Sequence, residues 1–308
     1  MKIIFMGNPQ FAVPSLSKLV ENGISPLAIV TDPPKRKGRG QYKQEQPVSL
    51  CAQDLDLPLL QPHSLSDSQF VNDISELNPD LFVVVAFKIL PKELLVVPKD
   101  GSINLHGSLL PAYRGAAPIQ HSLMNGDTET GLTTFLLKPK VDAGDILLQE
   151  KVEIIPEYDF GTLSEKMSQI GSALLLRTVK QAIDGTLNPI SQNDSLATPA
   201  PKIHPDMGCI DWNQSAEKIS NLIRGLSPIP GAFSKWNGKT IKFFNSSFKQ
   251  DASGMPGQFL QVEKVVMEIG TGRGRLEIRE IQLEGKKRLP VEDFLRGSTL
   301  APGDMFTS

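Results

Sequence analysis

Asn104 and His106 are the residues of this sequence whose types and spacing most directly suggest catalysis. Both belong to residues 103–106, a short apolar run that predicts a β-strand. Side chains two positions apart on a strand point to the same face, so an amide donor and an imidazole would stand side by side. With an ordinary pKa of ~6.5, an imidazole is suited to act as a general base near neutral pH. The alternative is that one of the two residues only caps a loop.

Two loops could complete a site around this pair. Residues 140–145 (KVDAGD) join two predicted strands, and their Ala-Gly step lets the backbone approach a ligand. This loop also offers a carboxylate that could orient and charge a histidine, although a turn with two solvated aspartates is an equal alternative. Residues 108–118 (SLLPAYRGAAP), which include Tyr113 and Arg114, predict a binding wall.

The other histidines and the cysteines have simpler explanations. His63 and His204 lie beside prolines and are expected at the surface, while His121 falls in a predicted helix and is expected to pack there. Cys51 and Cys209 are far apart and outside any metal-like spacing. They exclude a disulfide framework and a zinc finger, and they fit a reducing cytoplasm.

The elements that must position these residues alternate between strand and helix signals in the first half of the chain. Strands are predicted at 2–7, 27–31, 81–87, 103–106, 131–138 and 146–154. Helices are predicted at 13–23, at 48–53, near 66–77 with Ser66 or Ser68 as cap, and from a Thr162/Glu165 capping box to Gly185. This order predicts an α/β fold, a Rossmann-like doubly wound sheet that binds ligands beyond the carboxyl ends of its strands. The sequence lacks the G-x-G-x-x-G fingerprint of dinucleotide sites.

The rest of the chain predicts a second, smaller domain. Residues 187–203 contain three prolines and several small polar residues, which indicates a linker. A helix near 215–225 and five short strands follow, at 232–236, 240–244, 257–262, 265–269 and 276–283, with a hairpin signal at Asn237-Gly238. Together they predict a small OB-like β-barrel. We therefore expect a catalytic domain at 1–186, a linker at 187–203 and a C-terminal domain at 204–308.

Composition limits the class of protein. The 308 residues carry 32 Lys+Arg against 34 Asp+Glu, a formal net charge of -2, and 40% of them are hydrophobic. These values are ordinary for a globular protein and exclude wholesale disorder. No run reaches the ~20 apolar residues of a membrane-spanning helix. The N-terminus meets Gly, Asn and Pro too early for a signal peptide, so we expect a cytoplasmic protein.

One part of the sequence has a specific resemblance. Residues 104–120 (NLHGSLLPAYRGAAPIQ), followed by DAGDIL at 142–147, resemble the folate-dependent formyltransferase family. The similarity covers nearly the full length, through PAPKI, GCIDW, LIRGLSPIPGAF and NGKTIK. The GRG loop at 38–40 and the C-terminal domain are similar to those of the family members that act on a transfer RNA.

The resemblance implies transfer of the formyl group of a co-substrate, N10-formyltetrahydrofolate, to the α-amino group of initiator methionyl-tRNA, with no metal. Asn104, His106 and Asp142 match the catalytic triplet of the family. In these roles His106 would receive the proton of the amine, and Asn104 and the protonated His106 would donate to the tetrahedral oxyanion. Asp142 would orient the imidazole and favour its charged form.

The same resemblance implies two binding sites. The pterin is expected in a cavity walled by backbone from Ala86, Phe87, Lys88, Ile89, Leu90, Ser108, Leu109, Leu110, Pro111, Lys140, Val141 and Asp145. The transfer RNA is expected on a flexible basic loop at 35–43, where Arg39 matches the key arginine of the family. The positive side chains of that loop are Lys35, Arg36, Lys37, Arg39 and Lys43. The C-terminal domain would add an RNA-binding platform, and we expect a monomer.

Three alternatives stay open from the sequence. The NLHGSLLP form, with Gly107 after His106, is also found in formyltransferases that act on nucleotide-linked amino sugars. A formyltetrahydrofolate hydrolase would use water in place of the amine. A Rossmann-like RNA-binding module without activity would have no need for an intact set of Asn104, His106 and Asp142.

Overall fold

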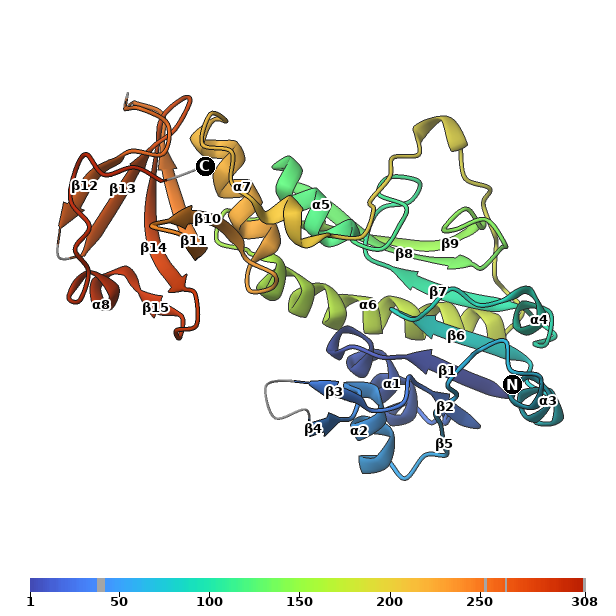
Figure 1. Cartoon of the computed structure of the whole chain (residues 1–308). Coiled ribbons are helices and arrows are strands. Elements are labelled where there is room, and N and C mark those ends of the chain that lie inside the picture. Colours follow the sequence, from blue (N-terminus) through green and yellow to red (C-terminus); the bar gives the residue numbers. More distant parts are fainter. Residues whose placement is uncertain (38–41, 252–253, 264, 307–308) are drawn as a thin grey trace. The chain divides into compact units, whose positions relative to one another are not determined.

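The computed structural model describes residues 1–37, 42–251, 254–263 and 265–306 (Figure 1). The chain divides into two compact units, each built from segments that are separate in the sequence. Unit 1 comprises Met1–Pro118, Thr130–Glu153 and Ser164–Ala200, and unit 2 comprises Ile119–Glu129, Ile154–Leu163 and Pro201–Ser308. In the described residues, no helix is long and apolar enough to cross a membrane.

Unit 1 is built on a mainly parallel sheet of seven strands, in the order β5-β2-β1-β6-β7-β8-β9. The strands are β1 (Ile3–Gly7), β2 (Ala28–Val30), β5 (Leu59–Leu60), β6 (Leu81–Val85), β7 (Ser102–His106), β8 (Glu129–Leu136) and β9 (Ile146–Glu153). The first five strands of the sheet are parallel, and β8 pairs antiparallel to β7. The predicted α/β domain with a parallel sheet is therefore confirmed. Strand order reverses direction between β1 and β6, where sheets of this kind bind ligands.

Helices of unit 1 connect these strands. They are α1 (Val13–Glu21), α2 (Pro47–Asp54), α3 (Ser68–Glu76) and α4 (Lys92–Leu95). In α5 (Pro118–Asn125) and α6 (Phe160–Ile183), some residues belong to unit 1 and the others to unit 2. Single 3-10 turns are η1 (Gln10–Ala12), η2 (Asp194–Leu196) and η3 (Pro205–Gly208). The apolar spacing located the longer helices within a few residues of their observed ends.

The predicted caps of α3 and α6 are each displaced to a nearby aspartate. Asp67, rather than Ser66 or Ser68, caps α3, because its carboxylate accepts from the backbone N–H of Gln69 at 2.8 Å. At the start of α6, Asp159 accepts from the N–H of Thr162 at 2.9 Å, and the Thr162 hydroxyl accepts in return from the N–H of Asp159 at 3.0 Å. A charged acceptor also interacts favourably with the positive end of the helix dipole.

Each face of the sheet of unit 1 is covered by helices. Val84 of β6 packs in one buried cluster with Ile74 of α3 and Leu94 of α4. Its register partner is Asn104, so Asn104 and His106 lie on this same face of the sheet. Leu105 points to the opposite face, where a Cβ at Gly171 of α6 would lie 2.9 Å from its side chain.

The basic segment differs from the expected flexible loop. Its flanks form a two-stranded antiparallel ribbon, in which β3 (Lys35–Lys37) pairs with β4 (Tyr42–Gln44). Lys35 opposes Gln44 and Lys37 opposes Tyr42, so backbone hydrogen bonds hold both ends of the segment. The glycines and Arg39 at 38–41 lie outside the described residues.

Unit 2 contains an antiparallel sheet and one long amphipathic helix, α7 (Ala216–Leu226). Its strands are β10 (Ala232–Trp236), β11 (Lys239–Lys249), β12 (Phe259–Glu263), β13 (Val266–Gly270), β14 (Arg275–Leu283) and β15 (Leu289–Pro290), followed by α8 (Val291–Leu295). Asn237 and Gly238 form the predicted hairpin turn, with φ of 49° and 73°. The core packs Ile219 and Ile223 of α7 against the sheet. Among the described residues the sheet runs from β10 to β12 without joining these two ends, so a closed barrel is not confirmed.

Candidate active site

His106 ends β7 at the carboxyl edge of the sheet, and only 7% of it is exposed. Its Nε2 lies 2.9 Å from the carbonyl oxygen of Tyr113. A carbonyl oxygen can only accept, so Nε2 carries a proton and donates it to this bond. In the neutral imidazole, Nδ1 is then the atom free to accept a proton. Phe135 meets the ring edge-on, at 6.3 Å between ring centres, and shields it from water.

Asp142 faces the other nitrogen of this ring. Its Oδ2 lies 3.8 Å from Nδ1 of His106 and accepts a hydrogen bond from the backbone N–H of Gly115 at 2.8 Å. A separation of 3.8 Å is too long for a hydrogen bond, so Asp142 acts on the imidazole through its charge. The resemblance implied that Asp142 orients the ring; in the structure the ring is hydrogen-bonded to the carbonyl of Tyr113.

The protonation of His106 reflects competing influences. Burial lowers the pKa of the imidazole, whereas the charge of Asp142 and the hydrogen bond to Tyr113 raise it. Burial dominates, so the pKa of His106 lies below its ordinary value. The resting imidazole is therefore neutral at physiological pH and able to accept a proton.

Asn104 lies two residues before His106, on the same face of β7. Its side chain is partly buried and lines a cavity together with Asp142. Within the described part of the chain, its amide has no hydrogen-bonding partner, so the NH₂ group can donate to a bound molecule. The structure thus brings the three predicted catalytic residues to one edge of the sheet.

The cavity beside Asn104 has a volume of about 90 Å³ and lies over the carboxyl ends of β6 and β7. It is lined by Val84, Phe87, Lys88, Ile89, Leu90, Leu95, Asn104, Leu137, Lys138, Pro139, Val141 and Asp142. Ile89 and Val141, two large apolar side chains of this lining, are 76% and 49% exposed. Their exposed surface would be covered by a ligand that enters between them.

The other residues predicted to bind folate are not among the residues that line this cavity. Ala86 directly follows β6, with φ of 48°. Ser108 and Leu110 are buried, with the Ser108 hydroxyl donating to the carbonyl of Ala112 at 2.6 Å and the Leu110 N–H donating to Thr133 at 3.0 Å. Leu109 and Pro111 belong to the same loop, which follows His106 in the chain.

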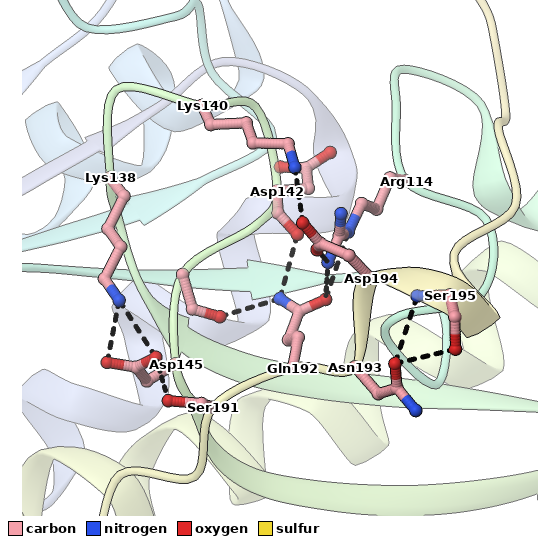
Figure 2. A network of polar contacts seen from close by, with 11 residues as sticks. Arg114, Lys138, Lys140, Asp142, Asp145, Ser191, Gln192, Asn193, Asp194 and Ser195 are labelled. Carbon is pink, nitrogen blue, oxygen red and sulfur yellow. Dashed lines mark hydrogen bonds and ion pairs between the residues drawn. The ribbon is translucent and has the colours of Figure 1, made fainter.

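Lys140 and Asp145, also predicted to bind folate, engage other side chains. Lys140 donates to Asp194 at 2.6 Å, and Asp145 accepts from Lys138 at 2.9 Å (Figure 2). Between them, the loop reverses sharply: a Cβ on Gly144 would overlap the carbonyl oxygen of Leu136. Only glycine fits there, which explains the Ala-Gly step of the motif.

Sequence reasoning missed the residue that holds this loop, Gln192. It lies in the segment predicted as a linker, whose residues up to Ala200 belong to unit 1. Its side-chain amide donates to the carbonyls of Asp142 and Gly144 at 2.9 and 2.7 Å (Figure 2). Arg114 donates to the Oε1 of Gln192 from two nitrogens, at 3.1 and 2.7 Å.

A second buried feature, Asp32, lies beyond the carboxyl end of β2. Its carboxylate, 4% exposed, pairs with Lys35 and with Lys88, at 2.6 Å each. Burial raises the pKa of Asp32, but the hydrogen bonds and charges of both lysines outweigh burial and hold the pKa below its usual value. Lys35 was predicted to bind tRNA and Lys88 to bind folate. In the structure both lysines pair with the same carboxylate, that of Asp32.

The remaining basic residues predicted to contact tRNA are placed as follows. Arg36 and Lys37 lie on β3, and Lys43 is exposed on β4. Arg36 and Lys43 are register partners across the ribbon. Arg39 lies outside the described residues, so its prediction rests on the sequence.

Comparison with known proteins covers both units. Residues 1–179 match the family model described as Formyl transferase, and residues 202–299 match Formyl transferase, C-terminal domain. The chain is 44% identical to a methionyl-tRNA formyltransferase of Geobacter metallireducens, over 98% of this chain and 97% of that protein.

Two solved structures share the fold at low identity. HypX from Aquifex aeolicus, in complex with tetrahydrofolic acid, aligns with a TM-score of 0.66 and 18% identity, covering 100% of this chain and 51% of that one. An N-formyltransferase from Helicobacter canadensis, in complex with folinic acid and dTDP-3-aminofucose, aligns with a TM-score of 0.67 and 17% identity, covering 94% and 100%. Similarity at this level concerns the fold alone.

Proposed function

The chain belongs to the formyl transferase family, and from this premise we propose that it transfers the formyl group of N10-formyltetrahydrofolate to the α-amino group of initiator methionyl-tRNA. The observation that supports methionyl-tRNA as the acceptor is the 44% identity to a methionyl-tRNA formyltransferase over 98% of the chain. The two folate-bound neighbours support a tetrahydrofolate as the donor. Such a reaction belongs to translation, so we expect the protein to act in the cytoplasm.

The acceptor amine must lose a proton before its nitrogen can remain bonded to the formyl carbon. His106 is the base for this step, because its pKa is lowered and Nε2–H is already committed to Tyr113. The proton therefore goes to Nδ1. There it creates an imidazolium beside the carboxylate of Asp142, whose Oδ2 lies 3.8 Å away. The new charge is thus stabilised at the moment it forms.

Attack of the amine on the formyl carbon places negative charge on the formyl oxygen. Asn104 is the donor suited to this oxyanion, because its amide lines the cavity without a partner among the described residues. By analogy with other oxyanion sites, one such donor contributes ~3 kcal/mol to transition-state stabilisation. When the oxyanion collapses, the bond between the formyl carbon and the folate nitrogen breaks, and the imidazolium of His106 returns its proton to that nitrogen. No metal and no covalent bond to the enzyme is required.

The folate supplies the electrophilic formyl carbon. The residues that would hold its pterin are Phe87, Lys88, Ile89, Leu90 and Val141, which line the cavity beside Asn104. The exposed faces of Ile89 and Val141 suit a flat ring. The basic ribbon at 35–44 and the C-terminal domain would bind the phosphates of the tRNA.

A formyl-transfer assay tests this function. N10-formyltetrahydrofolate would be offered with charged initiator methionyl-tRNA, with free methionine, or with an amino-sugar nucleotide. We expect transfer to the charged tRNA alone. Transfer to the sugar nucleotide alone would favour the alternative acceptor, which the fold likeness to the Helicobacter canadensis protein at 17% identity does not by itself support. Formate release without any acceptor would favour a hydrolase.

A further inference from the structure

We propose that Gln192 is a positioning residue for catalysis: its side-chain amide fixes the Asp142 loop at the separation from His106 that the reaction uses. This inference rests on the proposed function for the meaning of that separation. Gln192 is not among the residues that line the cavity, and its amide bonds to backbone carbonyls of the Asp142 loop on one side and to the guanidinium of Arg114 on the other.

Gln192 holds the Asp142 loop through two hydrogen bonds. Its Nε2 donates to the carbonyl of Asp142 at 2.9 Å and to that of Gly144 at 2.7 Å, so both amide hydrogens are used (Figure 2). Asp142 has φ of 49°, a left-handed conformation that costs free energy for a residue other than glycine. Such a conformation persists only where the surroundings hold it, and Gln192 supplies that hold from outside the loop.

Arg114 in turn holds the side chain of Gln192. Arg114 donates to Oε1 of Gln192 at 3.1 and 2.7 Å, and its side chain is only 11% exposed. The residues on either side of Arg114 hold the catalytic pair through their backbone. The carbonyl of Tyr113 accepts from His106, and the N–H of Gly115 donates to Asp142. Gln192 therefore ties together the two loops that hold His106 and Asp142.

The charged side chains around this amide already pair with one another. Asp194 pairs with Arg114 at 2.7 Å and with Lys140 at 2.6 Å, and Asp145 pairs with Lys138 at 2.9 Å (Figure 2). A neutral amide at position 192 can donate to two carbonyls and accept from a guanidinium at once, without adding charge beside Asp142. Within the described residues, Asp142 is the titratable group that acts on the His106 ring.

Two substitutions separate this role from a general effect on folding. Gln192→Ala removes the amide, and Gln192→Met removes the donors and the acceptor while keeping an unbranched side chain of similar length and no charge. Asn193→Ala is the matched control, because Asn193 lies in the same segment but, among the described residues, its side chain accepts only from Ser195, at 3.1 and 2.8 Å. Thermal unfolding of all three variants identifies any that fail to fold, and Gln192→Met decides if Gln192→Ala does not fold.

We expect kcat to fall by about 10- to 100-fold in the Gln192 variants, the range for a displacement near 1 Å of a catalytic group. The KM for tRNA should change little, and Asn193→Ala should keep both values. A second readout needs no activity: the NMR titration of the His106 imidazole. Because Asp142 raises this pKa, its displacement should move the pKa further down in the Gln192 variants only.

Each result has a defined meaning. A folded Gln192→Met variant with the kcat and the His106 titration of the control would overturn the proposal. A loss of kcat with an unchanged titration would overturn it too, because Gln192 would then act elsewhere. If the unmodified protein does not formylate methionyl-tRNA, the proposed function fails, and the titration still tests whether Gln192 fixes Asp142 near His106.

Discussion

Nδ1 of His106 and Oδ2 of Asp142 lie 3.8 Å apart, close enough for charge to act and too far for a shared hydrogen bond. The carboxylate is held instead by the N–H of Gly115 at 2.8 Å. Asp142 therefore gains most influence when the imidazole becomes charged during the reaction. In the resting enzyme, burial keeps the imidazole neutral.

The pH profile tests the state of His106. Since its pKa lies below the ordinary ~6.5, the neutral base should persist to lower pH, and the acid limb of kcat/KM should have its midpoint below that value. Asp142→Asn removes the charge that raises this pKa, so the midpoint should move further down. At this separation the lost interaction is about 1 to 4 kcal/mol, which lowers kcat about 5- to 1000-fold. A midpoint above 6.5, or an upward shift in Asp142→Asn, would contradict this account.

Replacement of the base should remove most of the rate without unfolding the protein. His106→Ala is expected to lower kcat by about 10²- to 10⁴-fold, the usual contribution of a general base. Single-turnover formyl transfer to methionyl-tRNA measures the loss. His63→Ala, which changes an exposed histidine, is the matched control. Near-normal turnover in His106→Ala would show that another group takes the proton.

Asn104 should affect the chemical step more than substrate binding. Asn104→Ala is expected to reduce kcat by about 10²- to 10³-fold, as for other oxyanion donors, with little change in the KM for tRNA. Asn104→Asp keeps the shape but replaces the donor by a carboxylate that repels the oxyanion, so it should be at least as damaging. If Asn104→Asp retained more activity than Asn104→Ala, the amide would have a different role.

Arg39 should influence tRNA use alone. Arg39→Ala is expected to raise the KM for methionyl-tRNA and to reduce the salt dependence of tRNA binding by about one released counterion. Folate binding, measured by fluorescence titration, serves as the internal control and should not change. An equal loss of both affinities would mean that the basic segment is not specific to tRNA.

The ion pairs of Asp32 predict a pH-dependent contribution to stability. Asp32→Asn leaves Lys35 and Lys88 without their common counter-charge, at a cost on the order of 1 kcal/mol, because both lysines are about half exposed to water. The folded-state pKa of Asp32 is lowered, so its contribution is present above the unfolded value of 3.8 and is lost as pH falls through the folded pKa. Thermal unfolding should therefore separate the variant from the natural protein at pH 7, and the difference should shrink toward pH 3. Asp54→Asn, at an exposed carboxylate, should show no such difference.

The parts of the fold that could be predicted are those with strong periodic signals. The apolar runs of β1, β6 and β7 and the helical spacing of α1, α6 and α7 led to elements close to those observed. The capping residues were misplaced because serine, threonine and aspartate all occur near those helix starts, and the sequence does not show which side chain reaches the free N–H groups. Two-residue strands such as β5 are too short to leave a pattern.

The site divides in the same way. Asn104 and His106 could be paired from a spacing of two on one strand. Gln192 could not, because it lies 50 residues from Asp142 and bonds to backbone carbonyls, which carry no residue-type signal. The pairing of Asp32 with Lys88 likewise depends on the order β2-β1-β6 in the sheet, which the spacing of residues along the chain does not reveal.

The contacts of Gln192 also set where the chain can be cut. A catalytic fragment that stops at Ile183, where α6 ends, would keep β7, the strand that bears Asn104 and His106. It would lose the side chain that holds Asp142 and Gly144, and also Thr198, whose carbonyl accepts from the N–H of Arg114 at 2.8 Å. A minimal fragment with an assembled catalytic centre must therefore extend to Ala200, where unit 1 ends.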